Sequence, residues 1–135
     1  MSDTLHLEIV SPERLLKDAE VAMVVVPGSD GEFTALPNHA PLMSTMRPGV
    51  IEIFEDETGE GERLFVKGGL VQISPSGLTI LAEETLVLDE VDGDDLAKQI
   101  TDMREDVQDA KDDIERAAAE KELSWMTVLA DVIAA

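Results

Sequence analysis

The amino-acid sequence predicts an α+β protein in which a β-sandwich is followed by an antiparallel hairpin of two helices. Between residues 5 and 88, apolar and polar side chains alternate with a period of two, which is typical of half-buried strands. After residue 89 the apolar side chains recur every three or four residues, as they do on one face of a helix. This change of period predicts two domains, residues 1–88 and residues 89–135.

The first strand is expected at residues 5–10. Leu5, Leu7 and Ile9 alternate there with other side chains, and Ser11-Pro12 ends the run. Because successive side chains of a strand point to opposite faces, these three residues should face the core. Further short apolar runs that are typical of strands occupy residues 21–26, 50–54, 63–66, 70–73 and 78–81.

The segments between these runs contain turn signals. Residues 55–62 are typical of a polar hairpin loop, and Ser74-Pro75-Ser76-Gly77 is typical of a second hairpin turn. Gly68-Gly69 lies within a strand pattern, which indicates a bulge or a close approach of two backbones. Residues 28–42 form the most specific connection, with two glycines, two prolines, one histidine and two carboxylates. Such a connection is suited to turning the chain, to chemistry or to contact with a partner.

The second domain contains two start signals for helices. Asp92 or Asp94 can serve as the N-cap of the first helix, where a carboxylate also suits the helix dipole. Asp112-Asp113-Ile114-Glu115 is typical of a capping box and predicts the start of a second helix. We favour an antiparallel hairpin. One long helix is the alternative, because no glycine or proline follows Gly93.

Each expected helix carries an apolar stripe, and such stripes mostly form cores. We therefore expect the helices to pack on each other and on the sandwich, with a partner-binding face as the alternative. The first stripe contains Leu96, Ile100, Met103, Val107, Ala110 and Ile114, and the second contains Ala118, Trp125, Val128, Leu129 and Val132. The residues expected to hold the hairpin together are Leu96, Ile100, Met103, Val107, Trp125 and Leu129.

The composition excludes several classes of function. Thirty acidic residues against ten basic ones give a formal net charge of -20, which repels phosphate backbones and anionic lipids. Only 3% of the residues are aromatic, too few for a platform on which bases stack. There is no cysteine, no apolar run near the roughly 20 residues that span a bilayer, and no secretory signal at the N-terminus. We expect a soluble protein that binds no nucleic acid and does not insert into a membrane.

No pattern of catalytic or metal-binding residues is visible. The sequence has no phosphate-binding loop and no nucleophile elbow. His6 and His39 are far apart in the sequence, so neither a metal site nor a bound cofactor is expected. The acidic segment at residues 89–95 is better explained as a solvated linker with a helix cap than as a calcium loop. For His39 we consider a structural role in a turn, a partner contact and, least of all, catalysis as a general base.

Several segments match one known family in order along the whole sequence. They are Leu-His-Leu-Glu-Ile-Val-Ser-Pro-Glu (5–13), Val-Pro-Gly-Ser-Asp-Gly-Glu-Phe (26–33), Leu-Pro-Asn-His-Ala-Pro-Leu (36–42), Arg-Pro-Gly-Val (47–50), Val-Lys-Gly-Gly-Leu-Val-Gln-Ile (66–73) and Leu-Thr-Ile-Leu-Ala-Glu (78–83). The sequence thereby resembles the epsilon subunit of bacterial F-type ATP synthase. The resemblance implies a β-sandwich of about ten strands with a two-helix C-terminal domain, consistent with the change of period.

The resemblance also implies a place and a set of partners. The family lies at the foot of the rotating central stalk, where it binds the gamma subunit and the polar loops of the c-ring. ATP chemistry takes place on the alpha and beta subunits, so a non-catalytic coupling subunit of a proton-translocating enzyme is implied. Its place would be the cytoplasmic face of the bacterial inner membrane, where the complex holds it. By the resemblance, Gly31, Glu32, Asn38 and His39 face the c-ring loops.

Some members of this family bind ATP through an Ile/Leu-Asp-x-x-Arg-Ala signature. Here Asp92 and Gly93 stand at its arginine and alanine positions. A carboxylate repels phosphate, so nucleotide binding is not expected. The acidic C-terminal helices are also expected to be weak or inactive as an inhibitor of ATP hydrolysis. Two alternatives of other classes are a free-standing regulatory domain that senses a ligand through its helices and, more distantly, a small hydrolase that uses His39.

Overall fold

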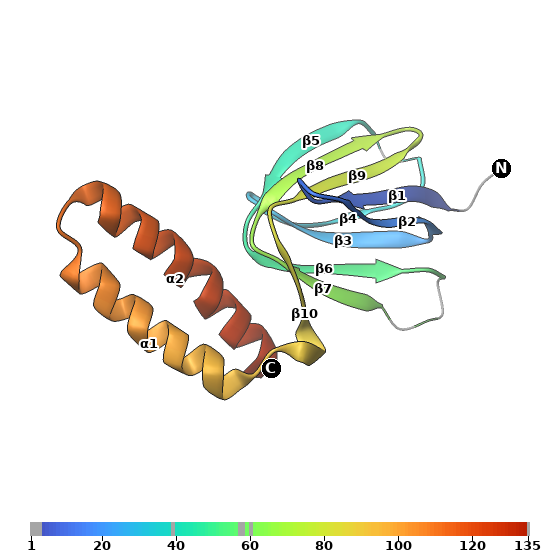
Figure 1. Cartoon of the computed structure of the whole chain (residues 1–135). Coiled ribbons are helices and arrows are strands. Elements are labelled where there is room, and N and C mark those ends of the chain that lie inside the picture. Colours follow the sequence, from blue (N-terminus) through green and yellow to red (C-terminus); the bar gives the residue numbers. More distant parts are fainter. Residues whose placement is uncertain (1–3, 39, 57–58, 60, 135) are drawn as a thin grey trace. The chain divides into compact units, whose positions relative to one another are not determined.

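The computed structural model describes residues 4–38, 40–56, 59 and 61–134, in ten strands followed by a short 3-10 turn and two helices (Figure 1). The protein divides into two compact units, residues 1–87 and residues 88–135. The predicted α+β architecture, with a β-sandwich first and two helices after it, is confirmed.

The strands form one curled sheet in the order β10-β7-β6-β3-β5-β8-β9-β1-β2, and β4 pairs with β3 outside this path. All pairs of neighbours are antiparallel except β1 and β9, which are parallel. The strands are β1 (Leu5–Val10), β2 (Leu15–Val21), β3 (Met23–Gly28), β4 (Gly31–Ala35), β5 (Leu42–Met46), β6 (Gly49–Phe54), β7 (Glu62–Val66), β8 (Gly69–Ser74), β9 (Gly77–Ala82) and β10 (Thr85–Val87).

The sheet becomes a sandwich because β3 belongs to both layers. One edge of β3 pairs with β4, and the other edge pairs with β6 at its start and with β5 at Gly28, opposite Met46. The sheet also curls back on itself, since Lys17 Nζ on β2, at one end of the strand order, lies 2.7 Å from Glu62 Oε2 on β7, the second strand from the other end. Inward-facing side chains fill the space between the layers, among them Leu7, Ile9, Val24, Val26, Ile51, Ile53, Val71, Leu78 and Ile80.

The turns follow the chemistry of their residues. Ser74 pairs with Gly77, so the hairpin between β8 and β9 has the two-residue turn that the sequence predicts. Gly69 has a φ of +147°, and a Cβ at this position would collide with the carbonyl oxygen of Leu81. The predicted close approach of two backbones at Gly68-Gly69 is therefore confirmed.

Four strands lie where the sequence pattern predicts no separate strand: β2, β4, β5 and β10. The prediction that residues 28–42 are one connection is wrong, because β4 lies within them and pairs with β3 from Val24↔Ala35 to Gly28↔Gly31. β4 is only five residues long. Its alternation is too short to be recognised between two glycines and two prolines.

The second unit is a hairpin of α1 (Gly93–Asp109) and α2 (Asp113–Ala134), preceded by the turn η1 (Leu88–Glu90). The two helices are in contact with each other, and the alternative of one long helix is wrong. The carboxylate of Asp92 caps α1 by accepting hydrogen bonds from the N–H groups of Asp94 and Asp95. The predicted start of α2 is also confirmed, because Glu115 N–H donates to Asp112 Oδ1 at 2.7 Å. The capping box is only half formed, since the Glu115 carboxylate accepts from Lys111 N–H at 3.4 Å.

The helices bury part of the predicted stripes. Leu96, Ile100, Trp125 and Leu129 are buried, as is Met126, which the sequence analysis omits. Met103 and Val107 are half-buried, and Val128 and Val132 are too, whereas Ala118 is exposed. The first stripe does not continue to Ile114, which is 83% exposed in the first turn of α2. Within the described residues, neither helix combines the length and the apolar character that crossing a bilayer requires.

Candidate functional site

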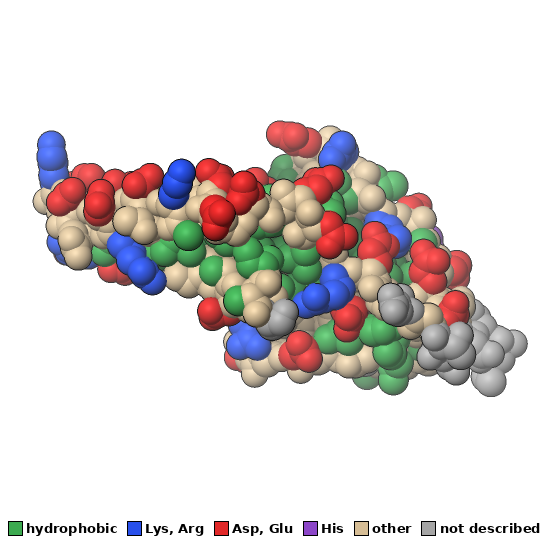
Figure 2. Space-filling view, turned by 90° about the horizontal axis from the view of Figure 1, so that it is seen from below, with side chains coloured by type: hydrophobic (Ala, Val, Ile, Leu, Met, Phe, Trp, Pro, Cys, Tyr) green, Lys and Arg blue, Asp and Glu red, His purple; other side chains and the backbone are tan. Residues whose placement is uncertain are grey.

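The features that could bind something lie on the surface of the molecule. Among the described residues no polar or charged side chain is buried, and none has a buried nitrogen or oxygen atom without a partner. The surface is strongly acidic, and acidic side chains are spread over both units with basic ones between them (Figure 2). Three features stand out: the segment expected to contact the c-ring, an apolar row and a histidine cluster.

The hairpin between β3 and β4 begins the first of these features. Ser29 and Asp30 form its turn, and Gly31 follows with a φ of +139°, which favours glycine. Ser29 N–H donates to the carbonyl oxygen of Thr45 at 2.9 Å, and the two hydroxyl oxygens lie 2.6 Å apart. These bonds fix the hairpin to β5, so Gly31 and Glu32 stand on a rigid support.

Glu32 is an exposed residue on β4 and belongs to the outer face of its layer. It borders an open hollow with Val25, Val50, Glu52 and Arg63. Arg63 Nε lies 3.9 Å from Glu52 Oε2, so the Arg63 guanidinium forms an ion pair with the carboxylate of Glu52. A polar or basic segment of a partner could approach Glu32 here without displacing core residues.

The structure does not bring all four predicted contact residues into one turn. Gly31 and Glu32 begin β4, whereas Asn38 follows its other end with a φ of 64°. The whole strand therefore separates the two groups. His39 lies outside the described residues. Any single partner that contacts both groups must span the length of β4.

The second feature is a row of apolar side chains on the outer face of the other layer, which we call the apolar row. Its members are paired directly across four strands: Leu70 of β8 with Leu81 of β9, Leu81 with Val10 of β1, and Val10 with Leu15 of β2. Residues opposite each other in a sheet point to the same face. Leu15 is 54% exposed and Leu81 is 47% exposed.

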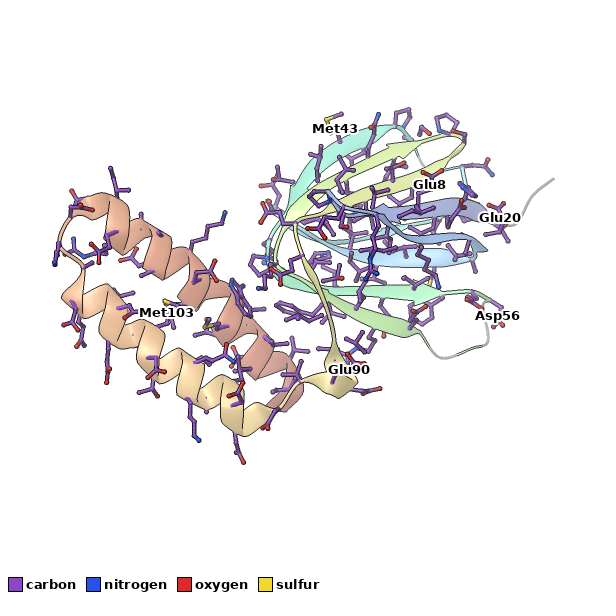
Figure 3. All side chains as sticks on the ribbon, viewed as in Figure 1. Glu8, Glu20, Met43, Asp56, Glu90 and Met103 are labelled. Atoms are coloured by element: carbon purple, nitrogen blue, oxygen red, sulfur yellow. The ribbon has the colours of Figure 1, made fainter. Side chains whose placement is uncertain are left out.

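Met43 of β5 extends this face. It pairs with Gln72 of β8, which also points outward, and its side chain is 61% exposed and points away from the sandwich (Figure 3). Contiguous exposed apolar side chains commonly mark an interaction site. The sequence holds one signal of this surface, namely adjacent apolar residues where strict alternation would place a polar one. These are Leu15-Leu16, Leu70-Val71 and Ile80-Leu81.

The third feature is a cluster of His6, Glu8, Asp18 and Glu20 on the outer face of β1 and β2 (Figure 3). His6 Nδ1–H donates to Glu20 Oε2 at 2.8 Å, and Nε2 lies 2.9 Å from Asp18 Oδ1 and 3.3 Å from Glu8 Oε1. The hydrogen bond to Glu20 raises the pKa of His6; partial desolvation of the imidazole opposes this rise, and the charges of Asp18 and Glu20 with the hydrogen bond to Glu8 add to it. The cluster has no signal in the sequence, because it depends on the register of β1 and β2.

Comparison with known proteins agrees with this fold over its whole length. The family model described as "ATP synthase, Delta/Epsilon chain, beta-sandwich domain" matches residues 4–87, and the model of the C-terminal domain of the ATP synthase epsilon chain matches residues 92–135. The sequence is 47% identical to the ATP synthase epsilon chain of Rhodospirillum centenum, over 99% of this protein and 94% of that one. It is 49% identical to that of Maricaulis maris, over 88% of each.

Solved structures show the same fold at low sequence identity. One subunit of the Euglena gracilis mitochondrial ATP synthase (OSCP/F1/c-ring) superposes with a TM-score of 0.86 at 22% identity, covering 98% of this protein and 83% of that subunit. One subunit of the Tetrahymena thermophila mitochondrial ATP synthase (central stalk/c-ring) gives a TM-score of 0.71 at 15% identity, with 96% of each covered. Both domain matches and the close relatives agree in one assignment, and the protein belongs to the ATP synthase epsilon chain family.

Proposed function

We propose that this protein is a non-catalytic subunit of the rotating central stalk in a proton-translocating F-type ATP synthase. It binds the gamma subunit and the polar loops of the c-ring, and it couples rotation of the ring to ATP synthesis on the alpha and beta subunits. The exposed apolar row is the observation that carries the proposal. A subunit that is held in a complex needs a surface whose burial by a partner is favourable in free energy, and exposed apolar side chains provide one.

The gamma subunit is the partner that the apolar row fits. A rotor subunit has to stay attached under torque, which calls for a contact that does not depend on screened surface charges. Leu15, Met43 and Leu81 project from a rigid sheet, so little conformational entropy is lost when a partner covers them. Burying an exposed leucine contributes about 1.5–3 kcal/mol, so a few such side chains make a stable contact.

The c-ring is the partner proposed for the segment with Gly31, Glu32, Asn38 and His39. Glu32 is exposed on a rigid strand, and Asn38 lies in the turn that follows it. Polar side chains of this kind suit the polar loops of a membrane ring, and their position at the two ends of β4 suits a partner that presents several loops in succession. With a net charge of -20, the protein would favour basic or neutral groups on those loops.

The same proposal gives the protein its place in the cell. It lies at the cytoplasmic face of the bacterial inner membrane as a peripheral subunit. The c-ring and the gamma subunit hold it there, and its contact with the alpha and beta hexamer is made through the complex. Its strongly acidic surface would not be attracted to anionic lipids by itself.

The proposal is tested by purifying a tagged copy of the protein from native membranes in a mild detergent. We expect the alpha, beta, gamma and c subunits to be recovered with it. A double variant of this outer face, Met43→Glu with Leu81→Glu, should lose them. The matched control is Ile114→Glu, which changes an exposed apolar residue on α2 in the same way and should retain them. Recovery of the unmodified protein alone would contradict the proposal and favour a free-standing domain.

A further inference from the structure

The register of β1 and β2 gathers one imidazole and three carboxylates on the outer face of the sandwich. His6 pairs with Glu20 and Glu8 pairs with Asp18, so these four side chains form two adjacent rows on the same side. The His6 nitrogen and one carboxylate oxygen each from Glu8 and Asp18 all lie within 4.8 Å of one another. The sequence argues against a metal site because the two histidines are far apart, but the register supplies carboxylates as the other ligands.

The orientation of the imidazole determines what the cluster can hold. Glu20 accepts the Nδ1–H hydrogen bond at 2.8 Å, which leaves Nε2 facing Asp18 and Glu8. Ionised carboxylates only accept hydrogen bonds, so a neutral imidazole in this tautomer would place three electron-pair donors against one another. Either a proton on Nε2 or a metal cation removes that repulsion, so the two compete for the same position. Histidines that bind metals commonly donate their other N–H to a carboxylate in this way.

We propose that His6 Nε2, Glu8 and Asp18 bind a divalent transition-metal ion of the Zn²⁺ type, with Glu20 as the residue that positions the imidazole. Tetrahedral Zn²⁺ has bonds of about 2.0–2.2 Å to nitrogen and oxygen, which puts neighbouring ligand atoms about 3.3 Å apart. The separations of 2.9 Å and 3.3 Å between Nε2 and the two carboxylate oxygens are close to this value. Water completes the fourth position.

The ligand set also limits the type of metal. An imidazole nitrogen suits zinc, copper, nickel and ferrous iron, whereas magnesium and calcium prefer sites made of oxygen ligands. The cluster is exposed, and the His6 side chain is 41% accessible, so an ion can enter from solvent. The strongly negative surface raises the local concentration of cations.

A bound ion would tie β1 to β2, the strand at one end of the sheet order. Val10 and Leu15 of the apolar row lie on the same two strands, so the ion would stiffen one end of that row. An ion that binds the folded protein and not the unfolded one raises the melting temperature to a degree set by its concentration relative to Kd. This proposal does not depend on the proposed function.

The test is isothermal titration calorimetry of the metal-stripped, full-length protein with ZnCl₂. We expect one saturable site with a Kd in the micromolar range, together with a rise in Tm of a few degrees. His6→Gln and Asp18→Asn should each weaken binding at least about tenfold. His39→Gln, which removes the other histidine, and Glu13→Gln, which removes a carboxylate of the same region, should bind as the unmodified protein does.

A second measurement covers the case in which a variant fails to fold. In the unmodified, isotope-labelled protein, Co²⁺ should shift or broaden the NMR signals of residues 6, 8 and 18 before any others. No saturable Zn²⁺ binding would overturn the proposal, as would parent-like binding by a folded His6→Gln variant. Co²⁺ effects centred on other residues would also overturn it. So would a His6 NMR signal that shifts with pH but does not shift when Zn²⁺ is added, since the cluster would then bind only a proton.

Discussion

Replacement of Leu81 in the apolar row should weaken binding to the gamma subunit while leaving the fold intact. Leu81 lies at the centre of the row, between Leu70 and Val10, and its side chain is 47% exposed. Full burial of a leucine contributes about 1.5–3 kcal/mol, so about half of that remains to be gained when a partner covers it. A loss of about 1 kcal/mol corresponds to a rise in Kd of about fivefold, which is the effect expected of Leu81→Ala.

A charged replacement should have a larger effect on the same contact. Leu81→Glu would place a carboxylate without a partner in a buried interface, and we expect a rise in Kd of about a hundredfold or more. In the free subunit the new carboxylate stays in water, so the free energy of unfolding should fall by only about 1 kcal/mol, which is the share of the leucine's burial that the sheet already provides. A large loss of binding with a small loss of stability separates a contact residue from a core residue.

The assay is biolayer interferometry with the purified gamma subunit of the same organism, with thermal unfolding of each variant followed by circular dichroism. Ile114→Ala and Ile114→Glu provide the matched controls, because Ile114 is 83% exposed on α2 and lies outside the row. A Kd for Leu81→Glu that equals that of the unmodified protein would refute the assignment of this face to the gamma subunit.

Three further predictions concern the c-ring segment, nucleotide binding and the helices. Glu32→Ala with His39→Ala should leave the fold intact but reduce coupled proton pumping or subunit retention in reconstituted vesicles, and unchanged pumping and retention would remove the c-ring role of these residues. By calorimetry, the isolated protein should show no saturable ATP binding up to millimolar concentrations. Asp92 stands at the position of the phosphate-pairing arginine of the ATP-binding signature, and its carboxylate already accepts hydrogen bonds from the first N–H groups of α1. A saturable ATP site would contradict this prediction. Removal of residues 93–135 should leave ATP hydrolysis by the assembled complex nearly unchanged. This segment has twelve carboxylates against five cations and no cation after Lys121, and this negative charge opposes docking on an acidic partner. A several-fold rise in hydrolysis with all subunits present would mean that the helices inhibit.

The parts of the fold that local patterns specify could be predicted from the sequence. The alternation of Leu5, Leu7 and Ile9 defines β1 and its inward face, and the hairpin between β8 and β9 follows from its turn residues. Asp92 and Asp112 mark the starts of both helices, because a cap acts on N–H groups within the next three residues. The short strand β4 could not be predicted because it has too few residues for alternation to stand out between turn signals.

The apolar row and the histidine cluster could not be predicted, because each depends on the register in which strands pair. Leu81 joins Val10 only through the parallel pair of β9 and β1, whose residues are about seventy positions apart in the sequence. His6 meets Asp18 and Glu20 only in one register of β1 and β2, and a shift by one residue would turn either set to the core. Leucine and histidine residues are common in any sequence. They indicate a site only when the pairing of strands places their exposed side chains together.

If this protein couples the rotor to ATP chemistry, ATP synthesis by the complex must depend on it. The ATP synthase complex of the same organism is depleted of this subunit, reconstituted in proteoliposomes and assayed for ATP synthesis driven by an imposed proton gradient, with and without the purified subunit. We expect the depleted complex to synthesise little ATP, the unmodified subunit to restore synthesis, and the Leu81→Glu variant to leave synthesis low. Full synthesis by the depleted complex, without any added subunit, would contradict this coupling role.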